Sequence, residues 1–281
     1  MPELPDLLYI QKYLRSAIIG RTIRNVAIKQ PIVLRVAIEG SAAAILLNKR
    51  IDDLELRGPF IRFGLSDSVD IVMNLMLMGK LQHQRPKERP EGYLCLSLIL
   101  DDDSVLNICD EQKMAKVYVV RSGDYSGIPK YSTQGVPIFS SEFTLESFAA
   151  LAKKHSRKQV RVFINDHTIM SSIGNAYADE ILFDARIHPK TFTAKLLSDE
   201  IMQLYSSIRS VMEWGIKNVE SAEQPIHVKV REHMKVRWRK GEPCPRCGTT
   251  IRREGVRGHD VFFCPTCQPA SRKLFIDWRK T

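Results

Sequence analysis

Cys244-Pro-Arg-Cys247 and Cys264-Pro-Thr-Cys267 decide the fold at the carboxyl end of this chain. Two thiolates at this spacing reach one tetrahedral Zn²⁺ from a tight turn, and two such pairs leave no coordination position open for catalysis. The prolines and Gly248 are residues that such turns favour. Two disulfides or four free thiols are the alternatives, but the matched turns favour one structural zinc ion held by all four cysteines.

Positive charge is concentrated around these cysteines. From Lys229 to the last residue there are fourteen Lys or Arg and five Asp or Glu, whereas the whole chain of 281 residues has a net charge of only +10. A merely solvated surface would intersperse acidic residues, and none occurs between Lys235 and Lys240. The pattern therefore predicts contact with the phosphate backbone of a nucleic acid.

The remaining composition excludes several classes of protein. A hydrophobic content of 44% in 281 residues is enough for one large or two modest cores. No apolar run is long enough to span a bilayer, and the amino terminus lacks the pattern of a signal peptide. We therefore expect a cytoplasmic, nucleoid-associated protein without a membrane partner. Cys95 and Cys109 lie in apolar segments and are expected to be core residues.

Hydrophobic periodicity predicts a helix, then strands, then more helices. Residues 4–18 have helical spacing, with Pro5 suited to the first turn. Short apolar runs then predict a β-sandwich or barrel, with strands at residues 23–28, 44–47, 61–65, 71–77, 94–100, 105–109 and 117–120. Glycine and proline mark a linker at residues 123–137. The helices expected after it are residues 144–155, 159–170, 175–185 and 198–218.

Three separate blocks of sequence resemble the formamidopyrimidine-DNA glycosylase and endonuclease VIII family. They are Pro2-Glu3-Leu4-Pro5, the block from Ile173-Gly174-Asn175 to Ile187-His188-Pro189, and Arg239-Lys240-Gly241-Glu242-Pro243 before the cysteines. The resemblance covers the whole chain and implies an α+β multidomain protein. Its parts would be a catalytic domain of amino-terminal helix plus β-sandwich (residues 1–125), a helix-two-turns-helix domain (residues 138–240) and a zinc finger (residues 241–281). Damaged or abasic DNA would bind in the cleft between them, and we expect a monomer.

The first block suggests how such a protein would act in base excision repair. Once Met1 is removed, Pro2 presents a secondary amine, and an α-amino group has a pKa of about 8, so part of it is neutral and nucleophilic. The resemblance implies a DNA glycosylase with abasic-site lyase activity, in which Pro2 attacks the sugar and Glu3 is the general acid. Taken alone, Pro2 and Glu3 would be interpreted as ordinary helix-start residues, and the two distant blocks reverse that interpretation.

The other blocks supply candidate DNA contacts. Gly174 and Asn175 lie where a helix begins, so backbone amides and the Asn175 side chain can hold a phosphate. Glycosylases also fill the gap left by the extruded nucleotide. The resemblance assigns contacts or gap filling to Arg161, Leu77, Lys113, Met114 and His259. Leu77 could equally be an ordinary strand residue.

The chain departs from the family pattern at several positions. Pro59 stands where the family has a lysine that reaches the lesion, and His259 stands where it has an arginine. Asp6 replaces the usual glutamate, and residues 219–230 lack the glycine pair of one family branch. These differences motivate an alternative, a noncatalytic protein that binds damaged DNA on the same fold. A zinc-finger transcription regulator gives no account of the first block.

Overall fold

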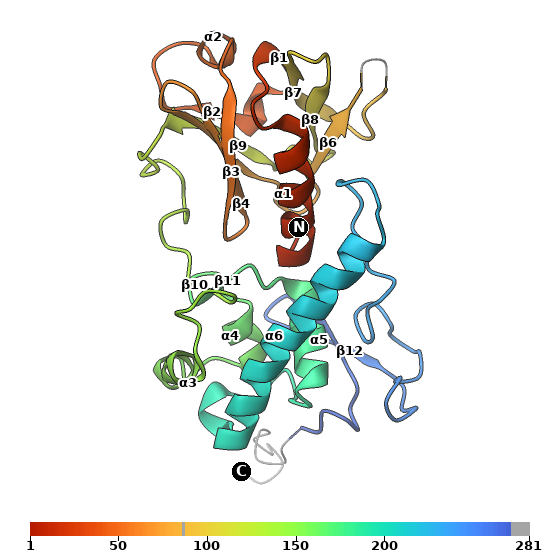
Figure 1. Ribbon diagram of the computed structural model, residues 1–281. Helices are drawn as coiled ribbons and strands as arrows, with labels where there is room; N and C mark the ends of the chain where they lie inside the picture. Colours follow the sequence, from red (N-terminus) through yellow and green to blue (C-terminus); the bar gives the residue numbers. More distant parts are fainter. Residues whose placement is uncertain (86–87, 271–281) are drawn as a thin grey trace. The chain divides into compact units, whose positions relative to one another are not determined.

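The computed structural model describes residues 1–85 and 88–270, so the last eleven residues of the predicted finger lie outside the described part (Figure 1). The chain divides into two compact units, which do not follow its linear order. The first unit combines Met1–Gln134 with Ile216–Val230, and the second combines Gly135–Gly215 with Arg231–Thr281. The predicted boundaries at residues 125, 138 and 240 stay a prediction.

The first unit contains helix α1 (Leu4–Ile18) and two β-sheets. One sheet has the order β1 (Ile23–Ile28), β7 (Leu94–Leu100), β8 (Val105–Cys109), β6 (Lys80–Gln84). The other has the order β2 (Leu34–Val36), β9 (Lys116–Arg121), β5 (Val69–Asn74), β4 (Phe60–Leu65), β3 (Ile51–Arg57). Neighbouring strands are antiparallel except β2 and β9. One core joins side chains of α1 and both sheets, which confirms the predicted β-sandwich.

Helix α1 forms because its apolar residues repeat at helical spacing. Leu7, Ile10, Leu14 and Ile18 are all buried in the core, and burying each such side chain is worth about 1.5–3 kcal/mol. The helix starts where predicted, with Pro5 in its first turn. This core fixes the direction of the first turn, and with it the position of the chain start.

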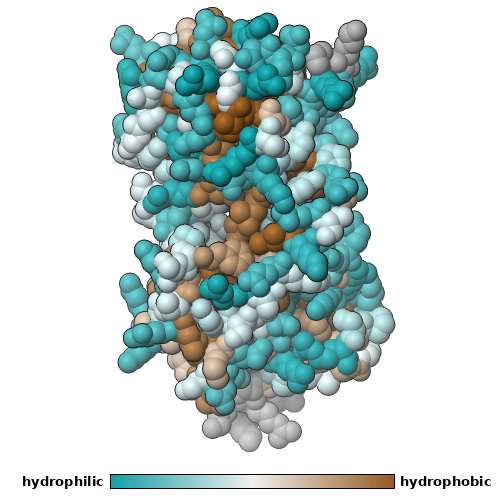
Figure 2. Space-filling view, in the orientation of Figure 1, coloured by the Kyte–Doolittle hydropathy of each residue, from teal (hydrophilic) through white to brown (hydrophobic). Residues whose placement is uncertain are grey.

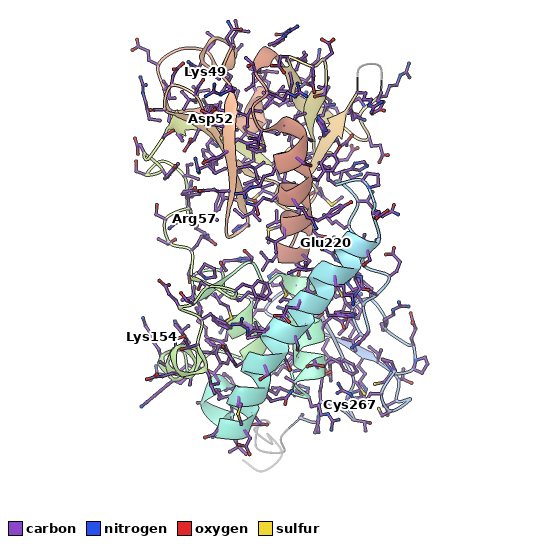
Figure 3. The ribbon with its side chains drawn as sticks, in the orientation of Figure 1. Lys49, Asp52, Arg57, Lys154, Glu220 and Cys267 are labelled. Carbon is purple, nitrogen blue, oxygen red and sulfur yellow. The ribbon has the colours of Figure 1, made fainter. Side chains whose placement is uncertain are left out.

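The segment 216–230 is attached to the first unit by contacts at both of its ends. The Tyr9 hydroxyl donates to the Gln224 carbonyl at 2.9 Å, and Lys12 pairs with Glu220 at 3.0 Å (Figure 3). Ile226 joins the core itself. Residues remote in sequence from α1 therefore complete the surroundings of its first turns.

The second unit is mainly helical and ends in a hairpin. Its helices are α3 (Leu145–Lys154), α4 (Val160–Ile164), α5 (Asn175–Asp184) and most of α6 (Ser198–Ser221), with the 3-10 turn η2 (Thr193–Lys195). Its strands are the parallel pair β10 (Val136–Pro137) and β11 (Met170–Ser171), and the hairpin β12 (Arg252–Val256) and β13 (His259–Phe263). A Cβ at Gly215 of α6 would lie 2.2 Å from the buried Tyr177 ring, so α6 can pass α5 only with glycine there.

Several predicted elements were wrong. Residues 44–47 are not a strand, because Ser41 caps a short helix α2 (Ala42–Leu46) by accepting from the Ala44 N–H at 3.3 Å. The predicted helix 159–170 ends at Ile164, and the predicted strand 71–77 ends at Asn74. Strands β2, β3 and β6 and the 3-10 turn η1 (Pro31–Val33) were not predicted.

Hydrophilic side chains cover much of the surface seen in Figure 2. Within residues 1–85 and 88–270, every helix is too short or too polar to cross a bilayer.

Candidate active site and metal centre

The amine at the chain start lies beside a second cationic group. The Met1 amine donates to the Leu77 carbonyl oxygen at 2.9 Å, and the Lys229 ammonium donates to the same oxygen at 3.1 Å. Burial, followed by the Lys229 charge, lowers the pKa of the Met1 amine to about 5. An amine in this position is therefore mostly neutral near pH 7, which is the nucleophilic form.

Pro2 and Glu3 lie directly next to this amine. Pro2 is buried, and Glu3, which precedes the first residue of α1, is only 6% exposed. The Asp6 carboxylate accepts a hydrogen bond from the Glu3 backbone N–H at 2.8 Å. Asp6, the residue that departs from the family pattern, thus fixes the backbone that carries Glu3 and Pro2. A small cavity here is lined by Pro2, Asp6 and residues 226–229, among others.

Leu77, predicted as a gap-filling residue, lies on an exposed turn after β5 and not in a strand. Its side chain is 52% exposed. The Met76 N–H donates to the Asn74 side chain at 2.9 Å, and a Cβ at Gly79 would lie 2.3 Å from the Leu75 carbonyl oxygen. The turn is therefore tight, and it presents Leu77 to solvent from a fixed backbone.

Lys113 and Met114 lie on a second exposed turn of the same unit. Asp110 is 1% exposed, and its carboxylate accepts from the N–H groups of Gln112, Met114 and Ala115 at 3.0, 2.8 and 2.7 Å. The Lys113 ammonium lies over the Tyr93 ring, 4.8 Å from its centroid. One buried carboxylate thus holds the backbone of both predicted gap-filling residues.

Asn175 begins α5 in the second unit, after Gly174 as its N-cap. Its side-chain oxygen accepts from Arg161 at 2.9 Å and from Asn165 at 3.0 Å. The oxygen is therefore occupied, which turns the amide NH₂ into the group that can donate to a ligand. The helix start adds a partial positive charge, so the arrangement suits a phosphate oxygen.

Arg161 is buried, at 2% exposure, and does not project into solvent. Its guanidinium donates to Asp179 at 2.9 Å, and Arg237 donates to the other Asp179 oxygen at 2.7 Å. Burial of a carboxylate is tolerable here because two guanidinium groups compensate it. The geometry makes Arg161 the support of Asn175, while a direct DNA contact stays a prediction.

The four cysteine sulfurs of Cys244, Cys247, Cys264 and Cys267 lie within 4.8 Å of one another. The Cys244–Cys267 and Cys247–Cys264 sulfur pairs are 3.9 and 3.5 Å apart. Zinc–sulfur bonds of about 2.3 Å at tetrahedral angles place sulfurs about 3.8 Å apart. Backbone N–H groups of Arg246 and Cys267 also point at cysteine sulfurs, at 3.4 Å in both cases. The donor set fits one structural zinc ion, and Cys267 is labelled in Figure 3.

Family models match three consecutive parts of the chain. The formamidopyrimidine-DNA glycosylase N-terminal domain matches residues 1–117, the H2TH domain of that enzyme matches residues 135–225, and a zinc finger found in FPG and IleRS matches residues 241–270. A formamidopyrimidine-DNA glycosylase of Symbiobacterium thermophilum is 30% identical over 291 residues, covering 100% of this chain and 93% of the relative. The chain belongs to the formamidopyrimidine-DNA glycosylase family.

Solved structures of this family agree with that assignment. The MutM (Fpg) protein of Thermus thermophilus superposes with a TM-score of 0.84 at 28% identity, covering 96% of this chain and 100% of that one. The Lactococcus lactis Fpg, in complex with abasic-site DNA, superposes with a TM-score of 0.86 at 24% identity, which shows the shared fold. The predicted family, fold class and structural zinc are confirmed.

The structure locates two residues that depart from the formamidopyrimidine-DNA glycosylase pattern, Pro59 and His259. Pro59 and Gly58 form the two-residue turn between β3 and β4, where Gly58 has a φ of +56°. Because proline fixes a negative φ, this turn is of type II′, and it offers no cation. His259 is exposed at the start of β13, after the turn residues Arg257 and Gly258, which both have positive φ.

Sequence reasoning missed three residues of this family member's candidate site. Lys229 was counted only as part of a basic tail, although it meets the chain start. Asp179 and Glu180 were quoted in the central block without a role. Glu180 is 2% exposed and accepts from the N–H groups of Lys235, Val236 and Arg237 at 3.0, 2.9 and 2.9 Å. Two adjacent acids on a helix before a basic segment are the signal that could have indicated this role.

Proposed function

We propose that Pro2, after removal of Met1, is the nucleophile of this DNA glycosylase and abasic-site lyase, and that Glu3 is its general acid. The observation that supports the proposal is the position of the chain start: the Met1 amine, one residue before Pro2, lies next to Lys229 on the shared Leu77 carbonyl oxygen. Desolvation and a neighbouring cation both favour a neutral amine. The full-length similarity to DNA glycosylases supports the same reaction.

The proposed reaction has two bond-breaking stages. The Pro2 nitrogen forms a bond to the anomeric carbon of the damaged nucleoside as the bond to the base breaks, and the leaving base takes up the proton that the Pro2 nitrogen loses. Glu3 then protonates the ring oxygen as its bond to the anomeric carbon breaks, which opens the sugar and leaves an iminium. The resulting iminium makes the neighbouring carbon acidic, and loss of its proton expels the 3′ phosphate, which cleaves the strand. At an abasic site the same amine condenses with the aldehyde and releases water.

Substrate choice is part of the proposal. The Gly58–Pro59 turn offers no cation toward a lesion, whereas the Fpg structures similar to this chain include complexes with a Fapy-dG lesion. We infer that this protein acts on abasic sites or on bulky and crosslinked bases in preference to common oxidised purines. We place it in the cytoplasm at the nucleoid, where its DNA substrate is.

Borohydride trapping on duplex DNA with an abasic site tests the proposal. Wild-type protein is expected to give a covalent adduct that mass spectrometry maps to Pro2. Pro2→Leu is expected to give none there, because a larger second residue keeps Met1 and leaves an amide nitrogen. Glu3→Gln is expected to slow the release of a damaged base, measured on a duplex that still carries that base, with Glu39→Gln, an exposed acid of the same unit, as its control.

The alternative function predicts a different result. A noncatalytic damage-binding protein would bind abasic DNA with wild-type and Pro2→Leu proteins alike and yield no adduct from either. That outcome, obtained with protein from which Met1 has been removed, contradicts the proposed chemistry.

A further inference from the structure

Trp238 is the most unusual residue of the basic segment before the zinc finger. Its side chain is 56% exposed, and its backbone has a φ of +62°. Bulky residues rarely adopt a left-handed conformation, because Cβ approaches the backbone too closely, and such strain concentrates at functional sites. A glycine would suit this backbone better, so the exposed indole is held at a conformational cost.

Hydrogen bonds on both sides of Trp238 in the sequence fix the backbone that carries it. The buried Glu180 carboxylate accepts from the N–H groups of Lys235, Val236 and Arg237, directly before the tryptophan. On the other side, the Arg239 N–H donates to the Val236 carbonyl at 3.1 Å. The indole therefore stands on a rigid loop.

One face of the indole is covered and the other is open. The Arg237 guanidinium lies 5.0 Å from the Trp238 ring centroid and 5.0 Å from that of Phe262. Arg237 cannot move away easily, because it also donates to Asp179 at 2.7 Å and to the Asp260 carbonyl at 2.9 Å. With one face stacked on a fixed cation, the 56% exposure belongs to the remaining face and edge.

Basic residues border the indole on both sides in sequence, Arg237 before it and Arg239 and Lys240 after it. Lys240 is exposed, whereas the Lys235 ammonium lies over the Trp214 ring, 5.0 Å from its centroid. In the described part of the chain, Lys240 takes part in no ion pair. Proteins that bind single-stranded nucleic acid combine exposed aromatic rings with neighbouring cations. The bases stack on the rings, and the cations bind the phosphates.

We propose that Trp238 is a stacking platform for one unpaired base of single-stranded DNA. A base within a duplex has both faces covered by its neighbours, so only an unpaired or terminal base can lie on the open indole face. Trp238 belongs to the second unit, whereas Pro2 and Glu3 belong to the first, and the site gives the enzyme an affinity for unpaired DNA that the base-excision chemistry does not require. The stacking proposal and the proposed catalytic function have only one element in common, which is that DNA is the partner.

Fluorescence anisotropy with a labelled oligothymidylate of about 15 nucleotides tests this site, a length within the range that one single-strand module covers. Stacking is worth about 1–3 kcal/mol per base, so Trp238→Leu is expected to weaken binding by about 5- to 150-fold. Trp238→Phe keeps an aromatic face and is expected to retain most of the affinity. Phe139→Leu, which alters an exposed aromatic of the same unit, is the matched control.

An alternative role of Trp238 is purely structural: its side chain would only shield the Arg237–Asp179 ion pair from water. Leucine would also shield that pair, so unchanged oligothymidylate binding by Trp238→Leu overturns the proposal. An equal loss for a duplex of the same length overturns it too, because stacking on one open face distinguishes the two DNA forms. Trp238→Gly relieves the left-handed backbone, so weak oligothymidylate binding without a lowered unfolding temperature cannot result from misfolding and supports stacking.

The borohydride assay on an abasic duplex separates this site from the proposed catalysis. Trp238→Leu is expected to form the Pro2 adduct at the wild-type rate. If wild-type protein forms no adduct while oligothymidylate binding still depends on Trp238, the proposed chemistry fails and the stacking site stands.

Discussion

In the first unit two cationic groups share one neutral acceptor, whereas in the second unit two cationic groups share one anionic acceptor. The chain-start amine and Lys229 both donate to the Leu77 carbonyl oxygen. Arg161 and Arg237 both donate to the Asp179 carboxylate. The first arrangement disfavours a positive charge on the chain-start amine, whereas the second stabilises the positive charges of both guanidinium groups.

The difference separates reactivity from support. An amine that is discouraged from holding a proton is a better nucleophile at neutral pH. The guanidinium groups that pair with the buried Asp179 carboxylate instead hold Asn175 and the loop before the finger in place. The zinc centre is a supporting site of the same kind, because opposite charges compensate each other there too: four thiolates are expected around one dication.

The largest effect is expected from loss of the zinc ion. Structural zinc sites contribute about 10–16 kcal/mol of apparent binding free energy, so Cys247→Ser is expected to lose the metal, unfold the hairpin and abolish tight DNA binding. Zinc content by colorimetric release and DNA affinity by anisotropy measure this. Cys109→Ala changes a buried cysteine of the first unit and should keep one zinc per chain. Full DNA affinity after chelation would contradict the prediction.

Asp179→Asn breaks the supporting network directly. It leaves the buried Arg161 guanidinium and the partly buried Arg237 guanidinium without their anion, and removal of one partner of a buried ion pair destabilises by about 3–5 kcal/mol. Urea unfolding monitored by circular dichroism measures the loss. Asp103→Asn, at an exposed turn, should change stability by less than about 0.5 kcal/mol. If both variants unfold alike, the two-guanidinium arrangement is not what holds this unit.

Asn175→Asp separates the DNA contact from its support. The oxygen that faces Arg161 is kept, but the outward NH₂ becomes a second oxygen that repels phosphate. A hydrogen bond to a charged group is worth about 1.5–3 kcal/mol, so affinity for abasic duplex DNA should fall by about 10- to 150-fold while stability is retained. Asn48→Asp, an exposed position of the first unit, is the control. Unchanged affinity would remove Asn175 from the DNA interface.

Of the four substitutions, Lys229→Met should have the smallest effect, and it should change only how the trapping rate depends on pH. The neutral amine reacts, and it exists above the pKa of the amine. Burial and the Lys229 charge both lower the pKa of the Met1 amine, and we expect the same surroundings to act on the Pro2 amine. Removing the cation should raise that pKa, so the acid limb of the trapping rate should move to higher pH. The rate at high pH should stay unchanged. Lys12→Met is the control, and an identical pH profile for both variants would show that Lys229 does not set the amine pKa.

The sequence predicted those parts of the fold that depend on local pattern. Helix α1, strands β1, β7 and β8 and the cysteine spacing follow from periodicity and turn residues, and their bounds agree with the structure. The strand predicted at residues 44–47 was wrong because their sequence, Ala-Ile-Leu-Leu, suits a strand or a helix, and only the Ser41 cap decides. Lys229 could not be placed, since its position depends on contacts between residues far apart in sequence. The burial of Arg161 was missed for the same reason, because its partner Asp179 lies eighteen positions further along the chain.

The assignment of residues 216–230 to the first unit also sets the order in which the protein can be completed during synthesis. The sandwich residues leave the ribosome early, but Ile226 and Lys229 follow only after the helices of the second unit have been made. At about 5–20 residues per second, the newborn first unit spends several seconds without the cation that discourages protonation of its amine. The nucleophile therefore gains its final surroundings late, after the helices of the second unit have been made and just before the zinc finger is added.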